Sequence, residues 1–432
     1  MSIITRAMNL LREHGFLYTL RVAWGIFHRA INSVFVYPFK KKSYARFLRE
    51  IQLQDRVFLW TQDFGWSVPL YQRPQHIGRC LSEKNCTVFY YTSQYYDPDV
   101  TSIKEYQPNL YLVDRNNQPF INELHDFLDN IAKPKYLHVY STNMEISLNE
   151  LKEYQNKGYH IFYEYIDDLA PEISGTKEIP KNIQDKFDYV ACNDSIPMAV
   201  TADLLKMQII KMRGNRNLAF STNGVDIEHF QKIEDGFTFS QKFSCVLEKK
   251  HKIVGYYGAV AKWFDYELLK YAAKHLPDVE FVLIGKLYDE SYSLSGIGNI
   301  SNIHFIGPVP YQEIPQYASK FDICTIPFQV NSITNATSPL KLFEYMALGK
   351  PILTTSMLES SKYHSVNIAT NYEDFVEKVL MLLEYTPVLN PEYYALLSKE
   401  AGENMWSKKA DSILDMLRVM RLRTNEDPNA SL

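Results

Sequence analysis

The sequence has little that would suit a metal-binding, disulfide-linked or NAD-dependent protein. Its five cysteines are scattered without CxxC spacing, and their odd number argues against a disulfide framework or a zinc site. Such a chain fits a reducing cytoplasm, which is where we expect it. Neither Gly65 nor Gly258 begins a GxGxxG run, so a dinucleotide-binding dehydrogenase is not indicated. No internal repeat at the spacing of a solenoid is present.

The sequence also has no long apolar run. The segment 16–39 comes closest, but Arg21, His28 and Arg29 interrupt it. A membrane-spanning helix or a signal peptide needs an uninterrupted apolar stretch, so we expect neither.

Positive charge is concentrated in residues 1–50. This arm has a formal charge of about +7 within a chain whose net charge is −4, so the rest is acidic. Aromatic and aliphatic residues alternate with arginine at helical spacing and precede the cluster Lys40-Lys41-Lys42. One interpretation is an amphipathic segment lying on anionic lipid headgroups at the inner face of the plasma membrane. The other is a solvated basic helix packed on its own domain. We expect no nucleic-acid partner, because the acidic remainder would repel it.

Length and composition predict two packed domains. The chain has 432 residues, of which 46% are hydrophobic and 22% charged. Short apolar runs alternate with helical stretches, the pattern of α/β units with a parallel sheet. We predict a basic helical arm at 1–50, a first α/β domain at 51–225, a second α/β domain at 226–422 and a disordered tail at 423–432. The strands expected in the first half are Val57–Trp60, Thr87–Tyr91, Tyr136–Tyr140, Ile161–Ile166, Tyr189–Cys192 and Leu218–Ser221, and those in the second half are Ile253–Gly258, Glu280–Gly285, Ile303–Gly307, Ile323–Pro327 and Ile352–Thr355.

The most informative segment is SPLKLFEYMALGKP, at 338–351. Ser338 is a good N-cap, Pro339 suits the first helical position and Gly349 ends the helix. Apolar residues cover nearly every face, so Lys341 and Glu344 would be costly charges unless they had a ligand. A phosphate at the helix start would meet Lys341 and the free backbone N–H groups, while a carboxylate one turn later can accept hydrogen bonds from a ribose diol. The alternative is an ordinary Lys–Glu pair on a partly exposed face.

Two other strand-to-helix junctions carry cations. Arg73 and His76 fall in the first turn of a helix that begins after the loop TQDFGWSVPLYQ, and Lys262 follows Gly258 after the strand IVGYYG. Small residues let the backbone approach a ligand closely, and a lysine can reach across it. Three such junctions in two successive α/β domains predict a diphosphate held at the carboxyl ends of the strands, in a cleft between the domains.

These residues resemble the retaining, nucleotide-sugar-dependent glycosyltransferases of GT-B fold, especially the large family four. The matching segments of the second half are NGVDIEHF (223–230), KIVGYYGAVAKWFDYELL (252–269), PDVEFVLIG (277–285), NIHFIGPVPYQEIPQYASKFDICTIPF (302–328) and SPLKLFEYMALGKPI (338–352). In the first half the match is limited to 66–81 and 163–171, which are similar to bacterial surface-polysaccharide transferases, including the teichuronic-acid type. The resemblance implies two Rossmann-like doubly wound domains that face each other across a cleft, an acceptor domain at 51–225 and a nucleotide-sugar donor domain at 226–422.

The resemblance also assigns roles to residues. It implies that Glu344 binds the nucleotide ribose, that Lys262, Gly258 and the turn at 338–341 hold the diphosphate, and that Pro308 and Val309 lie by the base. The turn consists of Ser338, Pro339, Leu340 and Lys341. A UDP-sugar is the favoured donor, and neither a metal nor any other cofactor is expected.

One position departs from the family pattern. Ala336 stands where the family usually has a second glutamate, which touches the donor sugar, so the identity of the sugar is left open. Asn335 and Thr337 are the neutral hydrogen-bonding groups that can replace it.

The expected reaction transfers a hexose-type sugar, with retention of configuration, to a glycan or lipid-linked acceptor in cell-surface polysaccharide synthesis. Cations and helix N-termini would stabilise the leaving diphosphate without a metal, a role we assign to Lys262, Lys341 and Arg73. Asp167 follows the strand FYEYI and is predicted to orient the acceptor, or else to cap a helix. Trp66, Arg73 and His76 are the other expected acceptor contacts, with a loop-bound histidine as the alternative for His76.

Two other functions remain open at this level. A sugar-nucleotide 2-epimerase shares the fold but needs no acceptor, and a degenerate member would bind nucleotide as a scaffold at the membrane. Asp97-Pro98-Asp99 has the spacing of a metal-binding DxD motif, although such runs are commonly turns.

Overall fold

A computed structural model describes residues 37–426, apart from residues 63, 69–70 and 170–177. The chain forms two compact units, Met1–Tyr163 and Glu164–Leu432. The predicted domain boundary after residue 225 is a different division of the chain and stays a prediction. The basic arm predicted at 1–50 is described only from helix α3 onward, and the first 36 residues lie outside the described part.

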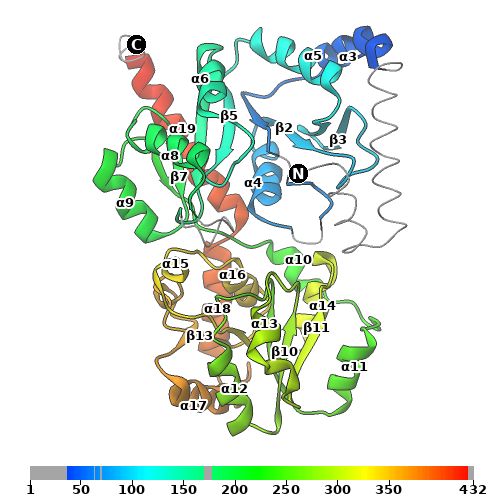
Figure 1. Ribbon diagram of the computed structural model, residues 1–432, viewed down its shortest axis with the longest axis vertical. Coiled ribbons are helices and arrows are strands. Elements are labelled where there is room, and N and C mark those ends of the chain that lie inside the picture. Colours follow the sequence, from blue (N-terminus) through cyan, green and yellow to red (C-terminus); the bar gives the residue numbers. More distant parts are fainter. Residues whose placement is uncertain (1–36, 63, 69–70, 170–177, 427–432) are drawn as a thin grey trace. The chain divides into compact units, whose positions relative to one another are not determined.

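The first unit is built on a mostly parallel sheet (Figure 1). Its strands lie in the order β3-β4-β2-β1-β5-β6, and β3 alone runs antiparallel to its neighbour. Their bounds are β1 Arg56–Trp60, β2 Cys86–Thr92, β3 Ile103–Gln107, β4 Leu110–Asp114, β5 Lys135–Tyr140 and β6 Tyr159–Tyr165, and the helices are α3 Tyr37–Glu50, α4 Arg73–Ser82, α5 Gln118–Asp129 and α6 Leu148–Asn156. β2, β4 and β5 are buried at every residue, as expected for parallel strands covered on both faces.

The second unit begins with a short α/β segment. It contains α8 Lys181–Ala191, β7 Met198–Val200, α9 Asp203–Arg213 and β8 Leu218–Phe220, with β7 and β8 paired in parallel. The strand predicted at Tyr189–Cys192 is wrong, because Tyr189, Val190 and Ala191 end helix α8. A four-residue apolar run is compatible with either structure, and here its apolar residues continue the helical spacing of Ile183 and Phe187, which are also buried.

The main sheet of the second unit is entirely parallel, in the order β11-β10-β9-β12-β13-β14. Its strands are β9 Lys252–Tyr257, β10 Val279–Ile284, β11 Ile303–Gly307, β12 Ile323–Ile326, β13 Ile352–Thr355 and β14 Val366–Ala369. Chain order reverses between β9 and β12, which defines the topological switch point of a doubly wound sheet. Ligands of such sheets bind outside the carboxyl ends of the strands at that point.

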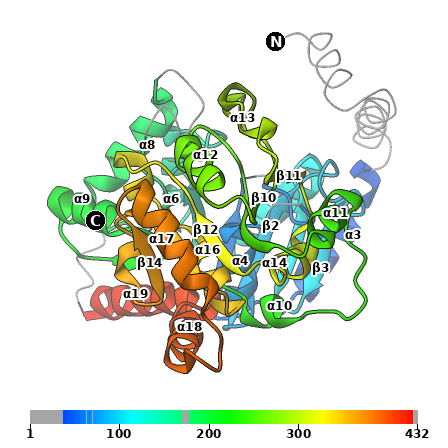
Figure 2. The same ribbon diagram turned by 90° about the horizontal axis from the view of Figure 1, so that it is seen from below.

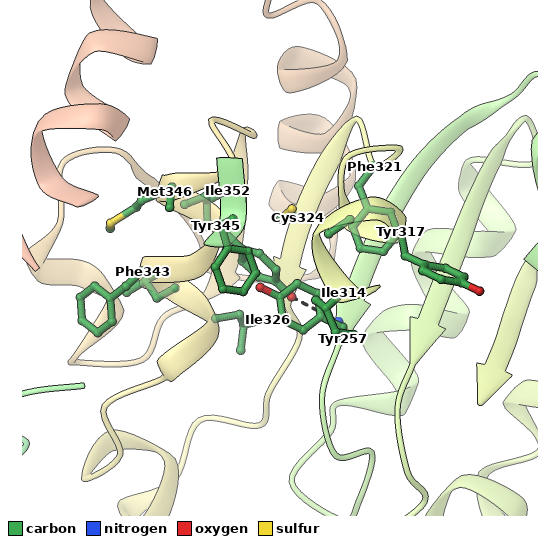
Figure 3. Packing of buried hydrophobic residues seen from close by; sticks show 14 of the residues in the cluster. Tyr257, Ile314, Tyr317, Phe321, Cys324, Ile326, Phe343, Tyr345, Met346 and Ile352 are labelled. Carbon is green, nitrogen blue, oxygen red and sulfur yellow. Dashed lines mark hydrogen bonds between the residues drawn. The ribbon is translucent and has the colours of Figure 1, made fainter. Parts of the chain in front are cut away.

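Helices cover both faces of this sheet (Figure 2). On one face, α12 Tyr266–His275 and α17 Tyr372–Leu383 contact each other over a buried cluster that includes Leu269 and Phe375. The other face packs against α10 Ile227–Gln231, α11 Gln241–Glu248, α14 Ile314–Ala318, α16 Leu340–Ala347 and α18 Pro391–Glu403. Figure 3 shows this second core, where the rings of Tyr257 and Tyr345 meet edge to face at 5.1 Å.

The remaining elements are short, apart from the last helix. They are α13 Ser291–Ser295, α15 Ser332–Asn335 and the 3-10 turns η1 Ile297–Asn299, η2 Tyr311–Glu313 and η3 Ser360–Lys362, followed by α19 Trp406–Glu426. The tail predicted at 423–432 lies partly in α19 and partly outside the described residues. In the described part of the chain, no helix is both long and apolar enough to cross a bilayer.

Candidate functional site

Two glycines form the floor of the candidate site at the carboxyl edge of the second sheet. Gly258 follows β9 with φ 134°, and Gly285 follows β10 with φ 143°, a conformation that side-chain-bearing residues rarely adopt. The Gly258 N–H donates to the Ile284 carbonyl at 2.8 Å. A Cβ atom placed on Gly285 would lie 1.9 Å from the Gly258 oxygen. The two strand ends are therefore in backbone contact, and the edge between them has no side chain.

Lys341 extends over this floor from the first turn of α16. A Cβ atom on Gly258 would lie 2.0 Å from Lys341 Cε and 2.8 Å from Nζ, so only glycine leaves room for the lysine. The ammonium group also lies 5.9 Å from the centroid of the Tyr256 ring. Burial lowers the pKa of Lys341, and the Glu344 carboxylate opposes that shift. The structure thus places a cation at a helix N-terminus, beside glycine backbone, where an anionic group would favour its charged form.

Glu344 lies one turn further along α16 and is only 2% exposed. Burial raises its pKa to about 7, against the opposing effects of the Lys341 charge and the Tyr257 hydroxyl. A surface Lys–Glu pair, the alternative interpretation of the sequence, does not fit a carboxyl buried to this degree. The arrangement instead provides a carboxyl group that gains from hydrogen-bond donors brought by a ligand.

The loop before α16 is held by Asn223. The Asn223 side-chain amide donates to the Ser338 carbonyl at 2.7 Å, and its backbone N–H donates to Ser338 Oγ at 3.3 Å. The predicted N-cap is wrong by one residue, because Pro339 occupies that position and the helix begins at Leu340. The Ser338 hydroxyl serves the contact with Asn223 instead of capping the helix.

The structure accounts for both polar neighbours of Ala336. Asn335 Oδ1 accepts a hydrogen bond from the Leu358 N–H at 3.0 Å, and the Thr337 hydroxyl donates to the Ile333 carbonyl at 3.0 Å. Ala336 itself is buried. Both side chains that were expected to replace the missing carboxylate therefore have structural roles in the turn that follows α15.

Lys262 lies in the loop between β9 and α12, with its side chain exposed. Its N–H donates to Asp289 Oδ2 at 3.0 Å, in the loop that follows β10. Hydrogen bonds from Ser291 and Lys262, together with the Lys262 charge, hold the pKa of Asp289 below its ordinary value even though burial opposes this. This carboxylate fixes the loop that carries Lys262, and contact of the lysine with a diphosphate stays a prediction.

Pro308 and Val309 directly follow β11. Pro308 is exposed, whereas Val309 is partly buried against the core beneath α16. They lie at the carboxyl end of a strand of the same sheet, and their predicted contact with a base stays a prediction.

Asp167 follows β6 and belongs to the second unit. Burial raises its pKa to about 6, and the negative charge of Asp168 acts in the same direction. Asp168 accepts a hydrogen bond from the Tyr165 hydroxyl at 2.9 Å. The alternative of a helix N-cap involves residues 170–177, which lie outside the described part, and it stays a prediction. A carboxyl with a raised pKa is suited to proton exchange near neutral pH.

The three predicted acceptor residues of the first unit are all buried. Trp66 is 1% exposed, and its ring lies edge-on to that of Tyr90 at 5.1 Å. Its backbone N–H donates to Asp97 Oδ2 at 2.8 Å. Arg73 and His76 lie in the first turn of α4, as predicted, and are also buried. Their contact with an acceptor stays a prediction.

Both carboxylates of the Asp97-Pro98-Asp99 sequence make contacts within the protein. Asp97 accepts hydrogen bonds from Thr92 and from the N–H groups of Trp66 and Ser67, and Asp99 pairs with Lys104. Among the described residues, no group of three or more His, Cys, Asp or Glu side chains is placed to hold a metal ion.

Sequence reasoning missed the positioning role of Asn223 and the closeness of Lys341 to Gly258. The first had a signal, because Asn223 opens one of the matched motifs. The second had none, because the contact joins residues far apart in sequence and depends on where α16 packs.

Comparison with known proteins agrees with this geometry. Residues 251–385 match the family described as glycosyl transferases group 1, a segment that contains Gly258, Lys341 and Glu344. The chain is 27% identical over 212 residues to the "putative teichuronic acid biosynthesis glycosyltransferase TuaH" of Bacillus subtilis. That similarity covers 47% of this chain and only about half, 52%, of the relative.

Solved structures show the same fold at low identity. The Anabaena protein Alr3699/HepE, solved in complex with UDP and glucose, superposes with a TM-score of 0.58 at 12% identity, over 84% of this chain and 99% of that one. WaaG, a glycosyltransferase involved in lipopolysaccharide biosynthesis, gives a TM-score of 0.51 at 13% identity, over 83% and 99% of the two chains. The predicted GT-B fold is thereby confirmed.

Proposed function

We propose, from a glycosyl transferases group 1 domain carried on a GT-B fold, that this protein transfers a hexose-type sugar from a nucleotide-diphosphate sugar to a glycan or lipid-linked acceptor. The observation that carries the proposal is the Lys341–Glu344 turn of α16 beside the glycine floor. It offers a cation and helix N–H groups for a diphosphate and, one turn away, a buried carboxyl for a diol.

The substrates are proposed from relatives. UDP is the favoured nucleotide, since Alr3699/HepE was solved with UDP and glucose. A role in cell-surface polysaccharide synthesis is supported by the relative named for teichuronic acid biosynthesis and by the neighbour named for lipopolysaccharide biosynthesis. We propose capsular polysaccharide as a further product of the same kind.

The proposed chemistry is electrostatic, retaining and independent of metal. Breaking the anomeric C–O bond leaves negative charge on the diphosphate, which Lys341, Lys262 and the α16 N-terminus would stabilise. The acceptor hydroxyl would attack from the face that the diphosphate leaves, and the diphosphate would take up the hydroxyl proton. Asp167 is proposed to orient that hydroxyl.

The first test is a thermal-shift titration with UDP, GDP, dTDP and ADP. A ligand that binds only the native state raises its stability by about 2.7 kcal/mol at 100 times Kd. We expect one diphosphate to raise the Tm of the wild type and of the control Glu267→Ala, whose side chain is exposed on α12, but not of Glu344→Ala. No shift with any nucleotide would refute the donor site.

Product analysis with the sugar form of that nucleotide then separates the three activities. The transferase releases nucleotide slowly in water and faster when an acceptor is present. A 2-epimerase would yield an isomerised sugar nucleotide without free nucleotide, and a scaffold would bind without turnover.

We also propose that the protein works in the cytoplasm, as a peripheral protein on anionic lipid. Helix α3 buries Tyr44 and Leu48, and its outer surface carries exposed cations and two exposed aromatic rings. Besides Lys41, which pairs with Glu123, the four cations are Lys40, Lys42, Arg46 and Arg49, and the rings are Phe39 (85% exposed) and Phe47 (40% exposed). Cations near an anionic surface contribute about 1 kcal/mol each, and apolar side chains enter the headgroup boundary.

Vesicle sedimentation tests this localisation. We expect binding to vesicles that contain phosphatidylglycerol and little binding to pure phosphatidylcholine, with a large loss when the four cations are changed to glutamine. The matched control is Val388→Ala with Leu389→Ala, two exposed apolar residues on the loop after α17. Equal binding of the two variants to anionic vesicles would contradict the role of α3.

A further inference from the structure

Beside the glycine floor, two aromatic rings stand together on the loops that follow β9 and β10. The rings of Trp263 and Tyr288 lie 5.6 Å apart at an angle of 45°. Tyr288 is 60% exposed and Trp263 is partly exposed. Charged groups are next to both rings in the chain, since Lys262 precedes Trp263 and Asp289 follows Tyr288. The pair joins an apolar surface to polar neighbours.

Hydrogen bonds fix both loops. Parallel pairing of the two strands continues past the glycines, because the Val260 N–H donates to the Lys286 carbonyl at 3.0 Å and the Tyr288 N–H donates to the Val260 carbonyl at 2.9 Å. The Gln329 N–H donates to the Trp263 carbonyl at 2.8 Å. With the Lys262–Asp289 hydrogen bond, four contacts hold the backbone that carries the rings.

A rigid aromatic pair at the ligand edge of a doubly wound sheet has a chemical meaning. Binding sites combine aromatic side chains with a few convergent polar groups, and a pre-ordered surface avoids the entropy cost of ordering a loop on binding. The electron-rich faces of Trp and Tyr attract the electropositive edges of a bound group. A pyranose ring presents such C–H edges on its faces and hydroxyl groups around its rim, which match the rings and the neighbouring charges respectively.

We propose that Trp263 and Tyr288 form a stacking subsite for a pyranose ring. The ring belongs either to the sugar of the donor or to the acceptor glycan, and the same chemistry serves both. The subsite rests on the proposed sugar transfer and adds to it the residues that hold the sugar rather than the nucleotide.

Tryptophan fluorescence gives a direct readout of this subsite. Trp60, Trp66 and Trp406 are buried at 0%, 1% and 2% exposure, so among the described tryptophans only Trp263 is open to solvent. The part of the acrylamide quenching that disappears in Trp263→Phe is therefore due to Trp263. This difference separates it from the other tryptophans, including Trp24, which lies outside the described part. The probes are UDP, UDP-glucose, maltotriose and chitotriose.

The expected result is that a sugar shields Trp263 from acrylamide. Greater protection by UDP-glucose than by UDP assigns the subsite to the donor sugar, and protection by an oligosaccharide assigns it to the acceptor. We expect Tyr288→Ala to weaken that sugar's binding about tenfold, which is about 1.4 kcal/mol. UDP affinity should stay unchanged, Tyr288→Phe should retain binding, and Phe47→Ala, on α3, is the control for loss of an exposed ring.

Two results would overturn the subsite. In the first, UDP alone protects as fully as UDP-glucose and no oligosaccharide adds protection, which would mean contact with the base or phosphate. In the second, no sugar protects Trp263 although calorimetry shows that nucleotide binds. If no nucleotide binds, the proposed function is refuted instead. Protection of Trp263 by an oligosaccharide would then support the subsite, and lack of protection would overturn it.

Discussion

The loops at the central strands of the two sheets serve different purposes. After β1, in the first unit, the rings of Trp66 and Tyr71 pack edge to face at 5.9 Å. The Asp97 carboxylate accepts hydrogen bonds from the backbone N–H groups of Trp66 and Ser67 in the same loop. After β9, in the second unit, glycine replaces side chains and Lys341 occupies the space. Loops of comparable position are thus packed with aromatic side chains in one sheet and lined by glycine backbone in the other. The comparison teaches that two first-turn cations, Arg73 and Lys341, can stand in different surroundings, one after an aromatic loop and the other beside glycine backbone.

The largest effect is expected when a glycine in each of the two loops is changed to alanine. Gly258→Ala places a Cβ atom 2.0 Å from Lys341 Cε, so we expect at least a hundredfold loss of nucleotide diphosphate affinity by calorimetry. Gly65→Ala places one 2.5 Å from Tyr96 Cγ at φ 68°, and should destabilise the first unit by about 1–3 kcal/mol without changing affinity. Equal affinity losses in the two variants would show that the contrast is false.

Lys341→Met should give the next largest effect. It removes the cation but keeps the length of the side chain, so we expect UDP affinity to fall about tenfold to a hundredfold while uridine affinity, which lacks the phosphates, changes little. Stability should stay the same or rise, because a partly buried cation at a helix N-terminus is lost. The control is Lys350→Met, whose lysine follows the C-terminus of α16 rather than its first turn. Parallel losses for UDP and uridine would contradict a phosphate contact.

Glu344→Gln should change the pH dependence of stability by about 3 kcal/mol. The native pKa of about 7 lies above the ordinary 4.5, so this carboxyl stabilises the fold when protonated, and that contribution is lost as the pH rises from about 4.5 through 7. The glutamine variant lacks this loss and should be more stable than the wild type at pH 8 in urea denaturation, while binding no nucleotide. A wild type more stable than the variant at pH 8 would contradict the raised pKa.

The smallest effect is expected at the opposite end of β10. Glu280 is buried and accepts hydrogen bonds from Lys249, His251 and His304, which hold its pKa below 4.5 although burial opposes this. Its stabilising contribution is therefore present above about pH 4.5 and lost as the pH falls through the lowered value. Acid denaturation of Glu280→Gln should be flatter than that of the wild type. Glu267→Gln, in an exposed pair with Lys270, should show no such change.

Much of the second sheet was predictable, because its strands are continuous apolar runs. Ile303–Gly307 and Ile352–Thr355 match β11 and β13 at both ends. Four strands were missed, β3, β4, β7 and β14. β4 carries the apolar signal, since it is buried at every residue, and was missed in spite of it. Two of the others lack it. β3 is polar and mostly exposed, and β7 has three residues, so each is defined by its pairing with a neighbouring strand.

The candidate site was predictable in its residue types but not in its contacts. The helix with Lys341 and Glu344 stood out because charges interrupt an otherwise apolar segment. Whether a given charge is buried, and what it touches, depends on packing between elements that are distant in sequence. Trp66 makes the same point, since this loop residue is buried among aromatic rings, and its contact with an acceptor stays a prediction.

The contact between Gly258 and Gly285 limits how this protein can diversify. Gly285 cannot gain a side chain without forcing the two strand ends apart, and a side chain on Gly258 would displace Lys341. We therefore expect sequence variation between related proteins to be small at these two positions and larger in the loops that follow them.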